Sequence, residues 1–158
     1  LAVGAGADRA LEIPGGSMPG VIGSATFVSW YNAHPDFVDL NPNLNTQNVV
    51  IIGHGNVAID IARVLVKTRN EMAESDIPDY AADAIENARI TDVYMLGRRG
   101  PVQAKFTNVE LREMGELEQA ISLVDSDQLP ADVPGDRCRG RLDRDHLCRF
   151  PSLRLKVG

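Results

Sequence analysis

A short glycine loop carries the clearest chemical pattern in the sequence, a G-x-G-x-x-A match at residues 53–58. It follows the β-branched run at residues 48–52 and opens a helical pattern, which is the context that this motif requires. Gly53 permits a tight turn, Gly55 lets a pyrophosphate approach the backbone, and Ala58 allows close packing of helix on strand. Free N–H groups at the start of the helix would point at the phosphates. The loop therefore predicts a dinucleotide site rather than a structural turn.

An arginine pair, Arg98 and Arg99, follows the next apolar run and Gly97. An NAD site in this kind of fold places an acidic residue near this point to hold the ribose 2′-hydroxyl. Guanidinium groups instead present forked donors that match a phosphate. The pair therefore favours the 2′-phosphate of NADP(H) over a surface pair that only ends a strand.

Two further residues have weaker claims when they are considered alone. Glu110 lies three residues after Thr107, so the spacing predicts a helix-capping box, although a carboxylate could also accept a ribose hydroxyl. From the residues alone the cap is favoured. His54 attracts interest only because it lies inside the glycine loop.

The elements that would position these residues alternate between strand and helix. Apolar periodicity and turn residues predict helices at 25–32, 56–68, 76–89 and 107–117, and strands at 48–52, 91–96 and 121–124. We expect Ser24 and Asp76 to cap two of the helices, and the strand at 48–52 to be buried on both faces. This order predicts an α/β fold with a parallel sheet flanked by helices.

The composition is that of an ordinary globular protein. The chain has 158 residues, of which 44% are hydrophobic and 24% charged, and no apolar run approaches the roughly 18 residues that span a bilayer. A net charge of −6 argues against a nucleic-acid partner. Residues 134–158 are basic, unlike the acidic remainder, and contain both cysteines, Cys138 and Cys148. We expect ordinary thiols there, and no metal site.

Several motifs in order resemble the middle of an adrenodoxin-reductase-type ferredoxin–NADP reductase. They occupy residues 8–15, 24–32, 53–63, 97–107 and 110–113, within residues 1–127. The resemblance implies a Rossmann-like NADP-binding domain of the two-dinucleotide-binding-domain flavoprotein type. It implies electron transfer between NADPH and a ferredoxin-like iron–sulfur protein through FAD.

The resemblance also implies roles for particular residues. The positions that match nucleotide contacts of the family are His54, Gly55, Asn56 and Val57, the pair Arg98 and Arg99 on the 2′-phosphate, and Glu110. Together with Gly53 from the motif, these form the predicted NADP site. We assign no catalytic residue, because the flavin performs the redox chemistry in such enzymes.

On this basis the chain divides into three parts. We expect residues 1–47 to form an edge of the FAD domain with a connecting segment, and residues 48–127 to form the NADP-binding domain. Residues 128–158 stay unassigned, as a tail that could be disordered. Most of the family's FAD site has no counterpart in these 158 residues, so we expect the chain alone to bind nucleotide weakly and to transfer no electrons.

Other readings stay open at this point. A glutamate-synthase-small-subunit-like reductase shares the loop but resembles residues 98–107 less well, and a non-catalytic nucleotide-binding module is a further alternative. A thioredoxin-reductase-like protein needs a closely spaced redox cysteine pair, and a short-chain dehydrogenase needs a Tyr-x-x-x-Lys that is not found. With no targeting segment and few cysteines, we expect a bacterial cytoplasmic location.

Overall fold

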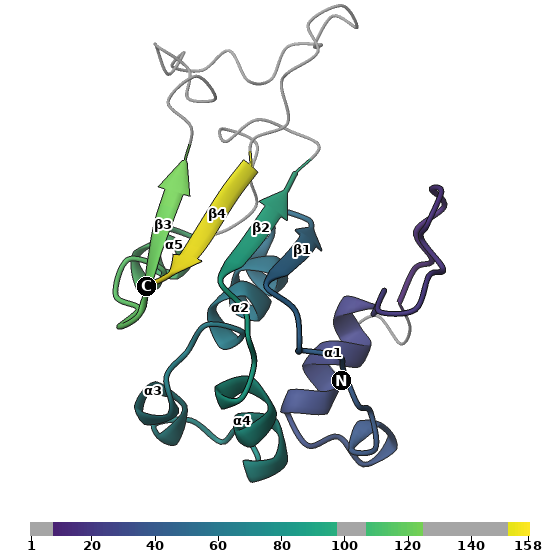
Figure 1. The fold of residues 1–158 in the computed structure, drawn as a ribbon, viewed down its shortest axis with the longest axis horizontal. Helices are drawn as coiled ribbons and strands as arrows, with labels where there is room; N and C mark the ends of the chain where they lie inside the picture. Colours follow the sequence, from purple (N-terminus) through teal and green to yellow (C-terminus); the bar gives the residue numbers. More distant parts are fainter. Residues whose placement is uncertain (1–7, 98–106, 125–151) are drawn as a thin grey trace, which may run out of the picture.

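The computed structural model describes residues 8–97, 107–124 and 152–158 (Figure 1). Four strands form one mixed sheet, and helices pack against it. The elements in chain order are α1 (Ser24–Tyr31), the 3-10 turn η1 (Pro35–Phe37), β1 (Asn48–Ile52), α2 (Asn56–Val64), α3 (Arg69–Ala73), α4 (Asp79–Glu86), β2 (Asp92–Leu96), α5 (Asn108–Glu113), β3 (Ala120–Val124) and β4 (Ser152–Val157).

The sheet has the order β1-β2-β4-β3. β1 and β2 are parallel, with Val49 opposite Val93, and α2 lies in the connection between them, as the predicted alternation requires. β4 is antiparallel to both of its neighbours, β2 and β3. The α/β class is therefore confirmed, and the sheet also contains an antiparallel strand from the segment that the sequence left unassigned.

β4 was missed although its pattern is that of a half-buried strand. Leu153, Leu155 and Val157 alternate with polar residues, and the leucines lie opposite Met95 and Val93 of β2. On the other face Arg154 donates to the Asp92 carboxylate at 2.6 Å and lies 5.3 Å from the centre of the Tyr94 ring. The sequence alone does not separate this strand from the basic tail, because the residues that precede it carry so many charges.

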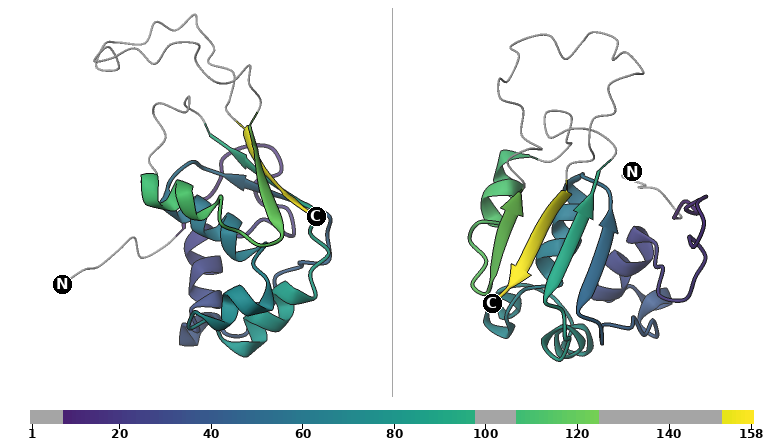
Figure 2. Two further views of the ribbon diagram at one scale, coloured as in Figure 1. Left: turned by 90° about the vertical axis from the view of Figure 1, so that its left-hand side faces the viewer. Right: turned by 45° about the horizontal axis from the view of Figure 1, so that its top comes forward.

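The helices of the described residues lie against one face of the sheet (Figure 2). Val50 and Ile52 of β1 are each 56% exposed on the other face, while Val49 and Ile51 pack against the core. The expectation that β1 is buried on both faces is therefore wrong for the described residues. The cause is that the described helices cover only one face of the sheet.

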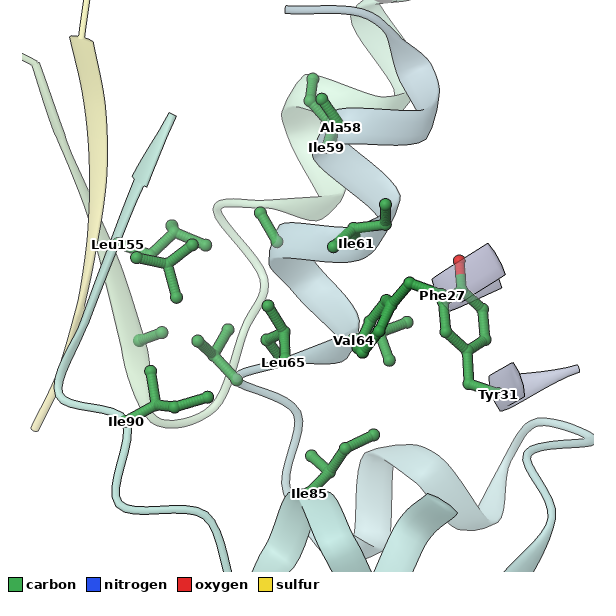
Figure 3. Packing of buried hydrophobic residues seen from close by; sticks show 14 of the residues in the cluster. Phe27, Tyr31, Ala58, Ile59, Ile61, Val64, Leu65, Ile85, Ile90 and Leu155 are labelled. Atoms are coloured by element: carbon green, nitrogen blue, oxygen red, sulfur yellow. The ribbon is translucent and has the colours of Figure 1, made fainter. Parts of the chain in front are cut away.

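The core forms where α2 packs on the sheet (Figure 3). Ile59 and Ala62 of α2 have no exposed surface, and neither do Val93 and Leu155 of the facing strands. Aromatic side chains of α1 extend this core to the other side of α2. Their members are Phe27, Trp30 and Tyr31, which are 6%, 2% and 3% exposed.

The helix starts differ from the expected caps in two places. Gly23, not Ser24, is the N-cap of α1, and the Asp8 carboxylate caps the helix by accepting the N–H groups of Ala25 and Thr26 at 2.7 and 2.9 Å. Pro78, not Asp76, is the N-cap of α4. The cap of α1 comes from a residue distant in sequence, which a local pattern does not reveal.

Three predicted helices are shorter than expected, and one of them, expected at 76–89, spans only Asp79–Glu86 as α4. The pattern at 56–68 is interrupted after Val64, and Thr68 starts α3 with a complete capping box to Glu71. The helix that starts after Thr107 ends at Glu113 rather than 117. Across the described ranges, no helix combines the length and apolar character needed to cross a membrane.

Candidate functional site

The glycine loop lies at the carboxyl edge of the two parallel strands. Gly53 follows β1 with φ at 145°, a backbone conformation that only glycine adopts readily. Its N–H donates to the carbonyl of Leu96 at the end of β2, at 2.8 Å. Gly97 follows β2 directly, so both glycine positions sit at the same edge. Ligands of parallel α/β sheets bind in the crevice outside this edge.

The start of α2 has no side-chain cap among the described residues. Gly55 is the N-cap residue. In the same part of the chain, Asp8, Thr68 and Thr107 cap α1, α3 and α5, whereas α4, like α2, has no side-chain cap. An uncapped start leaves N–H groups and the positive end of the helix dipole available to an anion.

The space beside Gly55 is open among the described residues. Its φ of −119° and ψ of 176° are accessible to any residue, so the backbone does not require glycine here. A Cβ built on Gly55 would meet no described heavy atom within 4 Å. The next residue but one, Val57, is 53% exposed. The glycine therefore has no internal packing reason in the described structure, and a phosphate approaching the backbone would supply one.

The side chains of His54 and Asn56 point away from this space, toward the neighbouring segment. His54 Nε2 lies 3.2 Å from the carbonyl oxygen of Met95. Asn56 Oδ1 accepts the backbone N–H of Thr107 at 3.1 Å. The structure thus places these two predicted site residues at the loop, with their side chains in contact with backbone groups of the protein.

Glu110 is held by a cation on α2. Arg63 Nη1 lies 3.1 Å from Glu110 Oε2 and 2.6 Å from Glu113 Oε2. The Arg63 side chain is 15% exposed, so this cluster is largely shielded from water. Thr107 Oγ1 accepts the N–H of Glu110 at 3.3 Å, which is half of the expected capping box. The other half is absent, because the Glu110 carboxylate turns to Arg63 and the N–H of Thr107 donates to Asn56.

A second polar contact fixes α2 from the opposite side. The hydroxyl of Tyr31 donates to Asp60 Oδ2 at 2.5 Å. Burial, and then the hydrogen bond to this carboxylate, raise the pKa of Tyr31 well above its usual value, so the phenol remains a donor. Polar contacts therefore join α2 to α1 on one side and to α5 on the other, and the first residues of α2 lie at the edge of the sheet.

The sequence did not single out Arg63 as part of the site. One indication was available, since Glu110 and Glu113 are three residues apart on one helix and so share a face that favours a cation. The predicted phosphate ligands Arg98 and Arg99 lie outside the described residues. So do Cys138 and Cys148. Among the described residues, no group of three or more His, Cys, Asp or Glu side chains could hold a metal ion.

The fold and the loop define the class. This is an α/β domain of the kind found in flavoproteins with two dinucleotide-binding domains, with a glycine loop at the carboxyl edge of its parallel strands. Comparison with known proteins narrows the class. The chain is 47% identical over 159 aligned residues to NADPH-ferredoxin reductase FprA of Mycobacterium leprae. It is 46% identical over 136 residues to the mitochondrial NADPH:adrenodoxin oxidoreductase of Arabidopsis thaliana.

Solved structures agree with these similarities. Mycobacterium tuberculosis FprA in complex with NADPH matches with a TM-score of 0.71 and 47% identity, over 75% of this chain. No family model matches the chain. The resemblance to adrenodoxin-reductase-type ferredoxin–NADP reductases is nevertheless confirmed by these relatives.

The chain corresponds to only part of each of these relatives. The chain spans 35% of the M. leprae protein and 28% of the A. thaliana protein. The M. leprae match covers 96% of this chain, so it extends into residues 128–158, which we could not place from the sequence.

Proposed function

We propose that this chain forms the NADP(H)-binding part of a ferredoxin–NADP reductase, an oxidoreductase that passes electrons between NADPH and a ferredoxin-like iron–sulfur protein through FAD. The observation that carries the proposal is the uncapped start of α2 behind Gly55, at the carboxyl edge of two parallel strands. The similarity to FprA in complex with NADPH supports the choice of nucleotide.

Each part of the site has a distinct task in this proposal. The backbone N–H groups of Asn56 and Val57 bind the pyrophosphate, and Gly55 leaves room for it. Arg98 and Arg99 bind the 2′-phosphate, which distinguishes NADPH from NADH. Glu110 contributes Oε1 to a ribose hydroxyl while Oε2 stays on Arg63. Gly53 and His54 shape the turn.

The redox chemistry belongs to the two cofactors. The residues of the predicted site would hold NADPH, which would supply a hydride, and in the whole enzyme FAD would take it up and pass electrons on. In this proposal residues 1–47 form an edge of the FAD domain, and no described residue is assigned a contact with the flavin itself. The contribution of this chain is to bind and orient the nucleotide, and no side chain of it needs to act as an acid or base.

The cellular setting is also a proposal. We propose a bacterial cytoplasmic protein, in keeping with the mycobacterial names, although other relatives are named as mitochondrial. The partner is an iron–sulfur protein, as the names ferredoxin reductase and adrenodoxin oxidoreductase indicate. The acidic charge of residues 1–133 offers no support for docking an acidic partner on this domain itself.

Calorimetric titration of the purified chain with NADPH and with NADH tests this proposal. Two arginines on a 2′-phosphate are worth on the order of 2–4 kcal/mol, which is roughly a 30- to 1000-fold preference for NADPH. The double variant Arg98→Ala/Arg99→Ala is expected to lose that preference while binding NADH unchanged. Equal affinity of the native chain for both nucleotides would contradict the arginine assignment, and a folded chain that binds neither would contradict the nucleotide site.

A further inference from the structure

The side chain of Arg63 joins α2 to α5 at the point where Glu110 lies. Arg63 Nη1 is 3.1 Å from Glu110 Oε2 and 2.6 Å from Glu113 Oε2. The Arg63 side chain is 15% exposed, and those of the two glutamates are 27% and 38% exposed. Because this cluster is partly buried, salt screens its charges less than those of a surface ion pair.

Packing alone does not explain a cation at position 63. Arg63 Nε is buried and has no hydrogen-bond partner among the described residues. An unpaired buried donor costs stability, and apolar side chains could hold two helices together without that cost. An unsatisfied group of this kind therefore calls for a functional reason.

A second contact ties the same face of α2 to the start of α5. Asn56 Oδ1 accepts the N–H of Thr107, the N-cap of α5, at 3.1 Å. Asn56 and Arg63 are seven residues apart in α2, so about two helical turns place them on the same face. The two contacts hold the first turn of α5, which contains Glu110, beside α2 and close to the glycine loop.

The contact with Arg63 fixes one oxygen of the Glu110 carboxylate, Oε2. A carboxylate that rotates freely loses side-chain entropy when it binds a ligand. An arginine that already holds Oε2 removes part of this cost and orients Oε1 before the ligand arrives.

We propose that Arg63 is a positioning residue of the nucleotide site, which fixes the Glu110 carboxylate so that Oε1 accepts a ribose hydroxyl. The inference rests on the proposed function and deepens it, because it adds a residue that acts through Glu110 without touching the nucleotide. The start of α2 binds the pyrophosphate independently of this contact.

Calorimetric titration of the full chain with NADPH and with inorganic pyrophosphate tests this role. Arg63→Met is expected to bind NADPH about fivefold more weakly, the loss of about one hydrogen bond, and pyrophosphate within about twofold of the native chain. Arg63→Lys keeps the charge without the planar guanidinium, so its NADPH affinity should lie between those of Arg63→Met and the native chain. Equal weakening of both ligands by Arg63→Met would show that the substitution disturbs the start of α2, and would overturn the inference.

A double-mutant cycle shows whether Arg63 acts through Glu110. Glu110→Ala alone is also expected to weaken NADPH binding about fivefold. Adding Arg63→Met to Glu110→Ala should then change the affinity by less than about twofold, because the carboxylate that Arg63 positions has gone. A further loss of about fivefold in the double variant would overturn the inference. If circular dichroism shows that Arg63→Met is unfolded, Arg63→Lys takes its place in the cycle, and its smaller loss should likewise vanish beside Glu110→Ala.

Arg112 offers a matched control on α5, because it is exposed and lies two residues after Glu110. Arg112→Met removes the same charge and is expected to leave both affinities unchanged. A loss equal to that of Arg63→Met would show that any missing cation weakens the binding of an anion, and would overturn the inference.

The same titrations distinguish failure of the inference from failure of the proposed function. If Glu110→Ala binds NADPH as well as the native chain does, the positioning inference is wrong, while the proposed function stands as long as NADPH is preferred to NADH. If the folded native chain binds no NADPH, the proposed function is contradicted and the inference fails with it.

Discussion

No feature of the described structure requires glycine at position 55, whereas a bound phosphate would require it. Because its backbone angles suit any residue and no described atom lies within 4 Å of a built Cβ, Gly55→Ala is expected to leave the melting temperature unchanged. The added methyl would crowd a bound pyrophosphate at a cost of about 1–3 kcal/mol, so NADPH and NADH should both bind about tenfold more weakly or worse. Thermal melting and calorimetry measure the two effects separately.

Gly53→Ala serves as the contrasting substitution. With φ at 145°, the native backbone strains any other residue by about 1–3 kcal/mol, and this variant should lower the free energy of unfolding itself. If Gly55→Ala bound nucleotides as well as the native chain, the loop would not hold a phosphate.

Arg63 neutralises part of a carboxylate pair that would otherwise repel. Its Nη1 contacts both Glu110 and Glu113, whose side chains are 27% and 38% exposed. Arg63→Met is therefore expected to lower the free energy of unfolding by about 1–3 kcal/mol, because it removes charged hydrogen bonds from a poorly hydrated cluster. Urea unfolding measures this loss.

A double-mutant cycle gives the prediction its control. Glu113→Gln alone should cost less than Arg63→Met, and adding it to Arg63→Met should recover part of the loss by relieving the repulsion from Glu110. Strict additivity of the two substitutions would show that the ion pairs contribute nothing that can be measured.

At the scale of elements, α1 depends on a carboxylate outside the helix. Burial raises the pKa of Asp8, but the hydrogen bonds from Ala25 and Thr26 lower it more, and the net pKa lies below its usual value. A depressed folded pKa means that the cap contributes stability above about pH 4, the unfolded value, and loses it as the pH falls through the folded value.

Asp8→Ala should therefore destabilise the chain by about 1 kcal/mol at pH 7, as the loss of a helix cap does. The difference from the native chain should shrink as the pH is lowered below 4, because protonation removes the cap from the native chain too. Urea unfolding at several pH values measures this. Asp39→Ala, at an exposed position, is the control and should show no such trend. A difference that stayed constant with pH would contradict the role of the carboxylate.

The elements that the sequence predicted well are those whose causes are local. The bounds of β1 could be predicted because a run of four β-branched residues, Val49 to Ile52, ends at Gly53. The start of α2 could be predicted because the glycine motif marks it. The length of α2 was not, because Thr68 and Glu71 form a capping box that starts a new helix. The cap on α1 could not be found, since Asp8 reaches it from a distant position.

The geometry of the glycine loop was predicted to a similar degree, whereas the nucleotide contacts stay a prediction. The glycine loop and its place beside β2 follow from local pattern, so Gly53, Gly55 and the start of α2 could be located in advance. The direction of the His54 and Asn56 side chains could not, because it depends on how close Gly97 and Thr107 lie in space. Contacts of this kind arise from tertiary packing, and a single sequence carries no direct record of them.

At the scale of the whole molecule, the sheet depends on β4. Leu155 has no exposed surface and lies opposite Val93 of β2 and Ser122 of β3. Leu155→Ala is expected to lower the free energy of unfolding by about 2–4 kcal/mol, from lost burial and an internal cavity. The neighbouring Lys156→Ala, on the exposed side, should change it by less than about 0.5 kcal/mol. Equal effects of the two substitutions in urea unfolding would contradict the register of β4.

β4 lies between β2 and β3 in the sheet but is synthesised after both of them. A ribosome adds about 5–20 residues per second, and roughly 55 residues separate the end of β2 from the start of β4. The hydrogen-bonding edge of β2 therefore stays unpaired on the order of 3–10 s until β4 has been made. β3 also stays unpaired until then, because its described neighbour in the sheet is β4. Unpaired strand edges are templates for pairing with other chains. The nascent chain is thus vulnerable to aggregation during this interval, after the glycine loop has been made and before β4 joins the sheet.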